Sequence, residues 1–106
     1  MSELLPKELK NELPKISEQE GSKDPNVYVV FQFPLSGWTW FVTEADSYED
    51  DICFFGYVVG LEREWGYFCL SELQSVDTDG VTVRRDVNHV QRPLSECLQQ
   101  YGLVEN

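Results

Sequence analysis

The middle of this chain, residues 38–73, contains all three tryptophans and three short runs rich in aromatic and β-branched residues. The runs are WTWFVTE (38–44), ICFFGYVVGL (52–61) and WGYFCL (65–70). Such residues favour strands, in which successive side chains point to opposite faces of a sheet. The stretch therefore predicts three strands with short connections, and the rest of the chain must complete a sheet around them.

Two further runs extend this sheet. Residues 27–33, VYVVFQF, predict a strand that pairs antiparallel with 38–44 through the turn PLSG. The run 52–61 is apolar on both faces, so we expect it inside the sheet, and Gly56 within it marks a bulge or a close approach of another backbone. Residues 81–87, VTVRRDV, predict a fifth strand at the edge, because charged side chains blunt sheet edges.

Amphipathic segments flank the strands. Residues 1–16 place leucines and Ile16 at spacings of three and four, and Pro14 is expected to end or kink this helical lead. Residues 93–101 predict a C-terminal helix, with Pro93 in its first turn and Gly102 as its stop. The apolar stripe of the lead is expected to pack on the sheet.

Together these elements predict a single α+β domain over residues 1–106. We expect a four- to five-stranded antiparallel meander sheet within residues 27–87, with the N-terminal and C-terminal helices on one face. A single helical turn capped by Ser71 is expected at 71–76.

The chain is strongly acidic, with a formal charge of −11. Between Asp24 and Val83 it has eleven acidic residues and one basic residue, Arg63, so this segment alone carries −10. Such a surface repels nucleic-acid phosphates and attracts basic proteins. A charge that only keeps a small protein in solution is the alternative explanation.

The three cysteines, Cys53, Cys69 and Cys97, form no CxxC pair and lie among apolar residues. We expect reduced, mostly buried thiols, and with them a cytoplasmic protein. The charged start, MSELLPKELK, lacks the apolar core of a signal peptide, and no run approaches the ~20 apolar residues of a membrane span. One histidine and three scattered cysteines predict no zinc site, and no cofactor or membrane association is expected.

Carboxylates gather in two predicted connections, an acidic loop at 45–51 and a tight turn at 60–64. Folding does not explain them at this stage, so they are the candidates for binding a partner. The candidates are Glu44, Asp46, Glu49, Asp50, Asp51, Glu62, Glu64 and Glu72. One continuous acidic face would favour imitation of nucleic-acid charge, a concave cluster would favour a site, and scatter would favour solubility alone.

No motif assigns a reaction, and no catalytic residue is predicted. His89 has no nucleophile or orienting acid at a recognisable spacing, although a pair with Cys69 or Cys97 stays open. The acidic loop lacks the glycine and the final glutamate of an EF-hand. The enzymatic alternative is a metal-dependent or carboxylate-based site built from Glu44, Asp46, Glu62 and Glu64.

The tryptophans, with Tyr57 and Tyr67, are the remaining candidates. Aromatic residues on a sheet can stack nucleobases, but such sheets come with basic grooves. The surrounding charge here has the opposite sign, so direct nucleic-acid binding is not expected. We expect most of these rings in the core and one or two as exposed anchors for a protein partner.

Several blocks of the sequence resemble a small bacterial family known as a domain of unknown function. The blocks are LLPKELKNELPKI, VYVVFQFP, GWTWFVTEAD, FFGYVVGLEREWGYFCLSEL, RRD and PLSE. Cys69 departs from the family pattern, where a serine is typical, and this argues against a catalytic hydroxyl there. The resemblance implies proteins of plasmids, integrating conjugative elements and phages, and it carries over no activity, cofactor or catalytic residue.

These observations predict a small acidic interaction module that binds a basic, nucleic-acid-handling protein. The resemblance suggests an anti-defence role, directed against restriction or CRISPR machinery. An accessory subunit of a mobile-element operon, bound through its terminal helices, is the other non-enzymatic alternative. The sequence does not define the oligomeric state.

Overall fold

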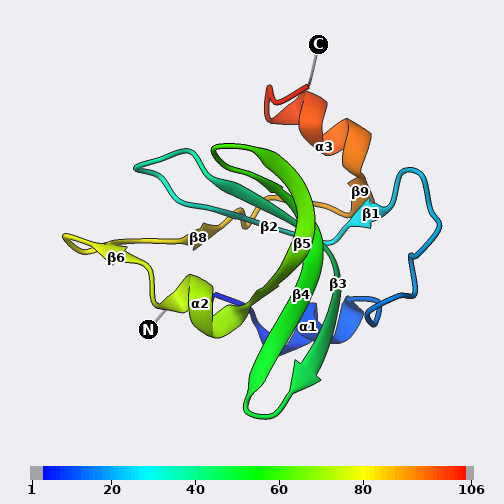
Figure 1. Cartoon of the computed structure of the whole chain (residues 1–106), viewed down its shortest axis with the longest axis horizontal. Coiled ribbons are helices and arrows are strands. Elements are labelled where there is room, and N and C mark those ends of the chain that lie inside the picture. Colours follow the sequence, from blue (N-terminus) through cyan, green and yellow to red (C-terminus); the bar gives the residue numbers. More distant parts are fainter. Residues whose placement is uncertain (1–3, 105–106) are drawn as a thin grey trace.

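The computed structural model describes residues 4–104 and confirms the predicted α+β class with an antiparallel sheet. Five strands lie in the order β5-β4-β3-β2-β8, and all neighbours run antiparallel (Figure 1). They are β2 (Val29–Gln32), β3 (Thr39–Tyr48), β4 (Asp51–Val59), β5 (Arg63–Cys69) and β8 (Arg84–Arg85). Strand β4 is an interior strand, as predicted, and β5 forms one edge.

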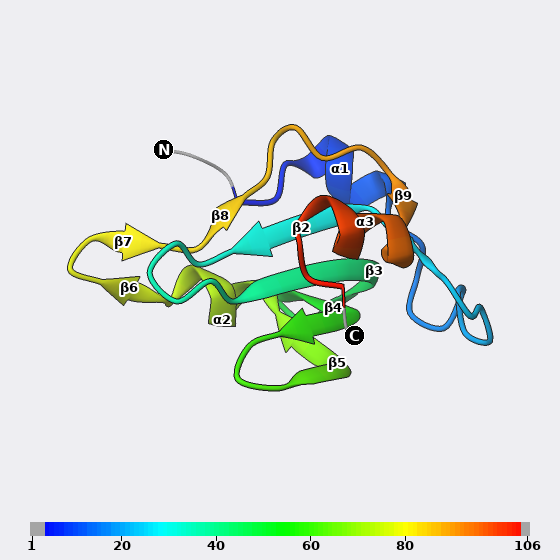
Figure 2. The same cartoon turned by 90° about the horizontal axis from the view of Figure 1, so that it is seen from above.

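Two small ladders complete the β structure. They are β1 (Asn26–Val27) with β9 (Arg92–Pro93), and β6 (Asp77–Thr78) with β7 (Val81–Thr82). The strand predicted over 81–87 is therefore divided between the β6–β7 hairpin and β8, and only β8 pairs with the main sheet. Figure 2 shows the β6–β7 hairpin at one end of the molecule and the loop between α1 and β1 at the other, in agreement with Figure 1.

The terminal helices lie on opposite faces of the sheet, so the prediction that they share one face is wrong. Helix α1 (Lys7–Glu12) and the leucines beside it pack on the face that carries Phe31 and Phe54. Helix α3 (Leu94–Gln100) packs on the other face, over Phe41. Strands covered on both sides must be apolar on both sides, which explains the weak alternation of β2 and β4.

Helix α1 is shorter than the predicted lead. Leu13 is extended, with φ −71° and ψ 135°, because the ring of Pro14 disfavours helical geometry in the preceding residue. Leu5 and Leu13 are buried in the core, which confirms the predicted packing of the leucine stripe. The beginning of the predicted lead, residues 1–3, lies outside the described residues.

Helix α2 (Leu70–Gln74) follows β5 directly and buries Leu73 in the core on the α1 side. Its cap is not Ser71, as predicted, but Cys69. Glu72 closes a capping box by accepting the backbone N–H of Cys69 at 2.8 Å. A carboxylate in the predicted partner-binding set therefore also caps a helix.

The predicted acidic loop at 45–51 is largely strand. Strand β3 continues to Tyr48 and β4 begins at Asp51, so the turn consists of Glu49 and Asp50. Ladder pairing and the burial of Ala45 outweigh the low strand propensity of aspartate and glutamate. The acidic pair at the turn is thus carried on the tip of a hairpin.

A bulge in β3 depends on a glycine in β4. The register between these strands shifts between Val42 and Glu44. A Cβ atom on the facing Gly56 would lie 2.1 Å from the carbonyl oxygen of Phe41, a distance that no side chain tolerates. The predicted close backbone approach at Gly56 is confirmed. Among the described residues, no helix has the length and apolar character needed to cross a membrane.

We expect Gly56→Ala to lower the free energy of unfolding by about 1–3 kcal/mol, because the added methyl group must push β3 and β4 apart. Gly66→Ala is the matched control: Gly66 pairs with Gly56 in the ladder, and a Cβ there meets nothing within 4 Å. Urea unfolding of both variants measures the difference. Equal losses would contradict the steric explanation.

Candidate functional site

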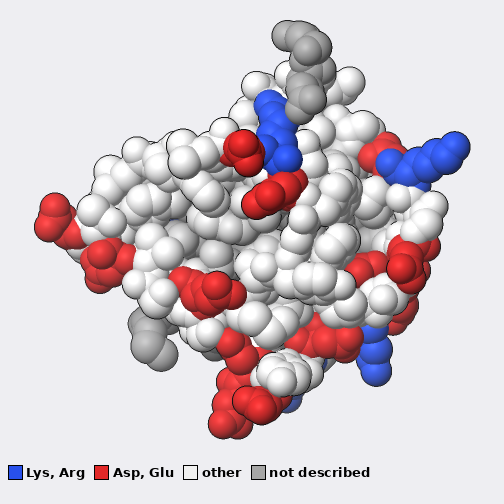
Figure 3. Space-filling view, viewed as in Figure 1, with Lys and Arg blue, Asp and Glu red and all other residues white. Residues whose placement is uncertain are grey.

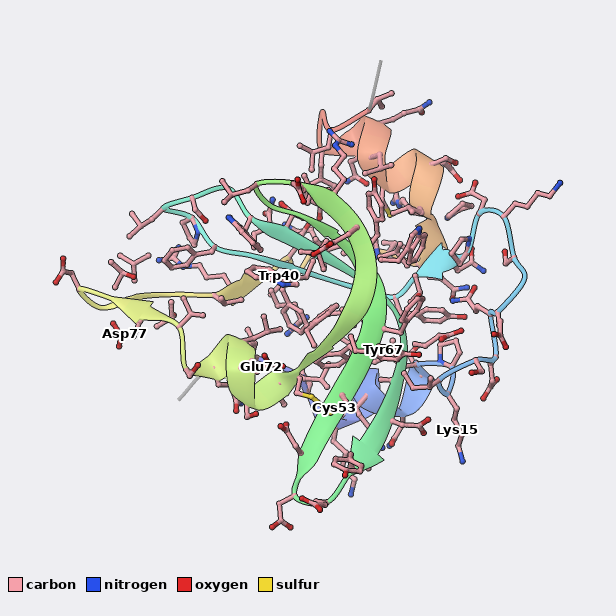
Figure 4. The ribbon with its side chains drawn as sticks, in the orientation of Figure 1. Lys15, Trp40, Cys53, Tyr67, Glu72 and Asp77 are labelled. Atoms are coloured by element: carbon pink, nitrogen blue, oxygen red, sulfur yellow. A yellow bond between two sulfur atoms is a disulfide. The ribbon has the colours of Figure 1, made fainter. Side chains whose placement is uncertain are left out.

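A pocket of about 250 Å³ opens between the sheet and the loop that joins α1 to β1. The loop side is formed by residues within 17–25. The sheet side is formed by Thr43, Glu44, Phe55, Trp65 and Tyr67. Figure 4 shows Tyr67 on the side of β4 and β5 that faces this loop, with Trp40 on the other side of these strands. The pocket therefore joins the N-terminal part of the chain to the central hairpin.

Four aromatic side chains form a row on this face of β4 and β5. Phe55 lies directly across from Tyr67, and Tyr57 lies across from Trp65. The rings of Phe55 and Trp65 stack with centroids 5.6 Å apart and an interplanar angle of 12°, and Tyr67 lies 5.0 Å from Phe55. We call these four residues the aromatic row.

Part of the aromatic row is open to solvent because β5 is an edge strand. Trp65 is 43% exposed and Tyr67 is 71% exposed. The prediction that one or two of these rings are exposed is confirmed for Trp65 and Tyr67, and their role as anchors for a partner stays a prediction. Apolar surface of this kind, bordered by polar groups, is typical of a binding site.

Glu44 lies in the pocket, yet it is only 4% exposed. Its carboxylate accepts the backbone N–H groups of Ser17 at 2.9 Å and Gln19 at 2.6 Å. Asp46, two residues later, accepts the N–H of Ile16 at 3.1 Å. Folding therefore does explain these two carboxylates, contrary to the sequence analysis: they hold the loop against the sheet.

Gln19 anchors the same loop from its other side. Its side-chain amide donates to the carbonyl oxygens of Asn26 and Thr43, each at 2.9 Å, and accepts the N–H of Asn26 at 2.8 Å. Ser17 has a positive φ of 81°, a strained conformation for a residue with a side chain. The loop wall of the pocket is thus held in a defined path. Sequence reasoning missed Gln19, because its partners, Asn26 of β1 and Thr43 of β3, meet it only in the folded chain.

The other candidate carboxylates lie at two distant places. Asp51 accepts the hydroxyl of Ser71, and this bond, with the backbone N–H groups of Ile52 and Ser71, lowers the pKa of Asp51 against the opposing effect of desolvation. Glu62 lies in the connection between β4 and β5, and Glu64 lies in β5 opposite Val58, near the other end of β4. From Asp51 to Val58 the strand advances by seven residues, so the two places lie roughly 23 Å apart at 3.3 Å per residue.

The candidate carboxylates therefore form no single acidic face. Glu64 pairs with Val58, and Glu44 pairs with Phe55, so their side chains point to opposite faces of the sheet. Figure 3 shows acidic residues spread around the visible face with uncharged surface between them. The four carboxylates of the enzymatic alternative, Glu44, Asp46, Glu62 and Glu64, do not meet in one site.

Cys53 and Cys69 are joined by a disulfide, so the prediction of reduced thiols is wrong for these two residues. They lie directly opposite each other in β4 and β5, with Cα atoms 4.1 Å apart. Spacing along the chain could not show this, because the pairing follows from the register of the hairpin. By alternation the disulfide continues the aromatic row on the same face. Asp51 lies within 4.8 Å of both sulfur atoms, but bonded sulfurs are not the thiolates that bind metals.

His89 and Cys97 have separate backbone partners. One ring nitrogen of His89, Nε2, lies 2.8 Å from the carbonyl oxygen of Val27. The Cys97 thiol is buried and donates to the carbonyl oxygen of Arg92 at 3.8 Å. Burial raises the pKa of Cys97 to about 11, which keeps it protonated and unreactive at neutral pH. The predicted packing role of Cys97 is confirmed.

Comparison with known proteins confirms the resemblance to a domain of unknown function. The profile of the family described as "Protein of unknown function (DUF2958)" matches residues 4–101. The chain belongs to this family. No curated protein and no solved structure matches it. The pocket, the aromatic row and the disulfide all lie within the part of the chain that defines the DUF2958 domain.

In this DUF2958 domain, we expect Glu44→Gln to lower the free energy of unfolding by about 1–3 kcal/mol, because one of two backbone N–H groups then faces an amide donor. Hydrogen exchange at the amides of Ser17 and Gln19 should become faster. Glu49→Gln, at the exposed hairpin turn, is the control and should change neither quantity. Unchanged exchange in the Glu44 variant would show that the carboxylate does not hold the loop.

Reduction of the disulfide should lower the stability of the domain by about 3 kcal/mol, since the bond closes a loop with a sequence separation of 16. Urea unfolding with and without dithiothreitol measures the effect. A variant with Cys53→Ala and Cys69→Ala should match the reduced protein and ignore the reductant. If reduction, verified by mass, leaves the unfolding midpoint in place, the disulfide has no stabilising role.

Proposed function

We propose that this protein is an acidic interaction module that binds a basic protein partner at the face of β4 and β5 beside the pocket. The observation that carries the proposal is the exposed aromatic row, with Trp65 and Tyr67 open to solvent next to the carboxylates of Glu20 and Glu44. Exposed tryptophan and tyrosine side chains supply much of the binding energy of protein interfaces.

The net charge of the chain favours a basic protein over a nucleic acid as the partner. At −11 the chain repels the phosphates of nucleic acids, although bare aromatic rings could otherwise stack bases. A basic protein gains from the same charge through faster encounter and complementary contacts at the rim. Carboxylates spread over the surface, rather than gathered on one face, suit this long-range role.

The placement of the carboxylates argues against ordered imitation of a nucleic-acid backbone. Ordered imitation of a phosphate backbone would need one continuous acidic face, and the candidate carboxylates lie at separate places. We therefore centre binding on the aromatic row and assign the carboxylates a supporting part.

The sequence resemblance implies proteins of mobile genetic elements, and we propose this setting for the interaction. We propose a cytoplasmic encounter with a nucleic-acid-handling host protein, in an anti-defence role. In a reducing compartment the disulfide at the end of the aromatic row would be exposed to thiols. The identity of the partner distinguishes this role from the alternative, in which the protein is an accessory subunit of a mobile-element operon. A host protein would favour the anti-defence role, and a protein of the same operon would favour the accessory role.

The test is retention of host proteins on the immobilised domain. We expect basic proteins to bind at low salt and to be released at high salt, because salt screens attraction between exposed charges. The double variant Trp65→Ala with Tyr67→Ala should lose this retention. Tyr48→Ala is the matched control, since Tyr48 is 65% exposed but lies outside the pocket.

Retention of no basic protein at low salt would overturn the proposal, and so would either of two further results. One is retention that ignores salt, which would remove the electrostatic argument. The other is retention by the double variant at the level of the Tyr48 control, which would remove the aromatic row from the interface.

A further inference from the structure

We infer that the pocket beside the aromatic row takes a single arginine side chain of the partner. This inference rests on the proposed function and names the chemical group that the site recognises, a guanidinium ion. Three properties of the pocket support it: its aromatic wall, its carboxylates and its size.

The aromatic wall offers the surface on which a guanidinium ion stacks. Cations bind over the faces of tryptophan and tyrosine rings, and the planar guanidinium group also stacks on them. Phe55 holds Trp65 in place by parallel stacking, while 43% of Trp65 stays exposed. Tyr67, tilted by 56° to Phe55, supplies a second ring at the mouth of the pocket.

The carboxylates supply the charge that a cation requires. Each oxygen of Glu44 accepts one backbone N–H, and a carboxylate oxygen has room for a second donor. Those N–H partners carry no net charge, so the buried carboxylate keeps its attraction for a cation. Glu20 adds an exposed carboxylate on the loop side. A guanidinium fork can donate to a carboxylate while its plane lies on a ring.

The size and rigidity of the pocket favour a side chain over a larger ligand. Its volume of about 250 Å³ lies below the range of roughly 300–1,000 Å³ that is common for small-molecule sites. The bonds of Gln19 and Glu44 hold the loop wall before any ligand arrives. A pre-formed site avoids the cost of ordering a loop on binding.

Arginine suits this site better than lysine. The lysine ammonium is compact and strongly hydrated, so it loses more on entering a pocket with an aromatic wall. The guanidinium group is flat, is weakly hydrated and has several donors. We therefore expect the site to distinguish the two cations, which net charge alone would not do.

The experiment titrates the intact protein with N-acetyl-arginine methylamide, followed by nuclear magnetic resonance. Saturable shifts are expected at the indole N–H of Trp65 and at the amides of Ser17 and Gln19. The lysine analogue should bind about fivefold more weakly. The citrulline analogue, which has nearly the shape of arginine without its charge, should show no saturable shift.

Variants assign the site. Tyr67→Ala and Glu20→Gln should each weaken arginine binding by about three- to tenfold. Tyr48→Ala and Glu49→Gln, which change an exposed ring and an exposed carboxylate outside the pocket, should leave binding unchanged. Circular dichroism of each variant confirms that the fold is kept. Glu44 is left intact because it holds the loop.

Equal shifts from arginine and citrulline analogues, or weaker binding of arginine than of lysine, would overturn the assignment to a guanidinium ion. If the arginine analogue does not bind while salt-dependent retention of a basic protein persists, this inference fails and the proposed function stands. If the analogue binds in the pocket but no basic protein is retained, the proposed function fails and the pocket assignment stands.

Discussion

The close approach of β4 to β3 at Gly56 is the constraint on which the rest of the structure depends. It accommodates the bulge between Val42 and Glu44. After the bulge, each residue of β3 points to the opposite face of the sheet from the one that unbroken alternation would give it. With unbroken alternation, Glu44 and Asp46 would point into the apolar core beside α1, and Ala45 would point away from it. The bulge instead buries Ala45 in that core and delivers both carboxylates to the loop.

Much of the fold follows from local pattern. Strands within 27–33, 38–44, 52–61 and 65–70, the turn at PLSG, the stop at Gly102 and the close approach at Gly56 depend on residue types and spacing, and the structure confirms them. The faces chosen by the helices could not be read in this way, because a sheet that is apolar on both sides offers either face. The length of the β3–β4 hairpin also could not be predicted from local pattern. The acidic residues near its turn have low strand propensity, and they adopt strand geometry because they pair with the opposite strand.

In the candidate site, too, some features follow from local sequence and others depend on tertiary structure. The charge of Glu44 makes it a candidate, but its burial and its bonds to Ser17 and Gln19 depend on tertiary structure. Tyr67 and Trp65 stood among the aromatic candidates, and their exposure follows from the edge position of β5. The loop that completes the pocket has the composition of an ordinary polar connection. The disulfide likewise arises from strand register, which links residues that no spacing rule connects.

The origin of the two pocket walls has a consequence for how the molecule folds. The bonds from Glu44 to Ser17 and Gln19 span 27 and 25 residues, whereas the β4–β5 hairpin forms between near neighbours in the chain. Contacts of high sequence separation pay a larger loop-closure entropy and tend to form later. The pocket is therefore complete only in chains whose N-terminal segment has docked, so the proposed recognition at this site would be restricted to the finished fold and absent from partly folded chains.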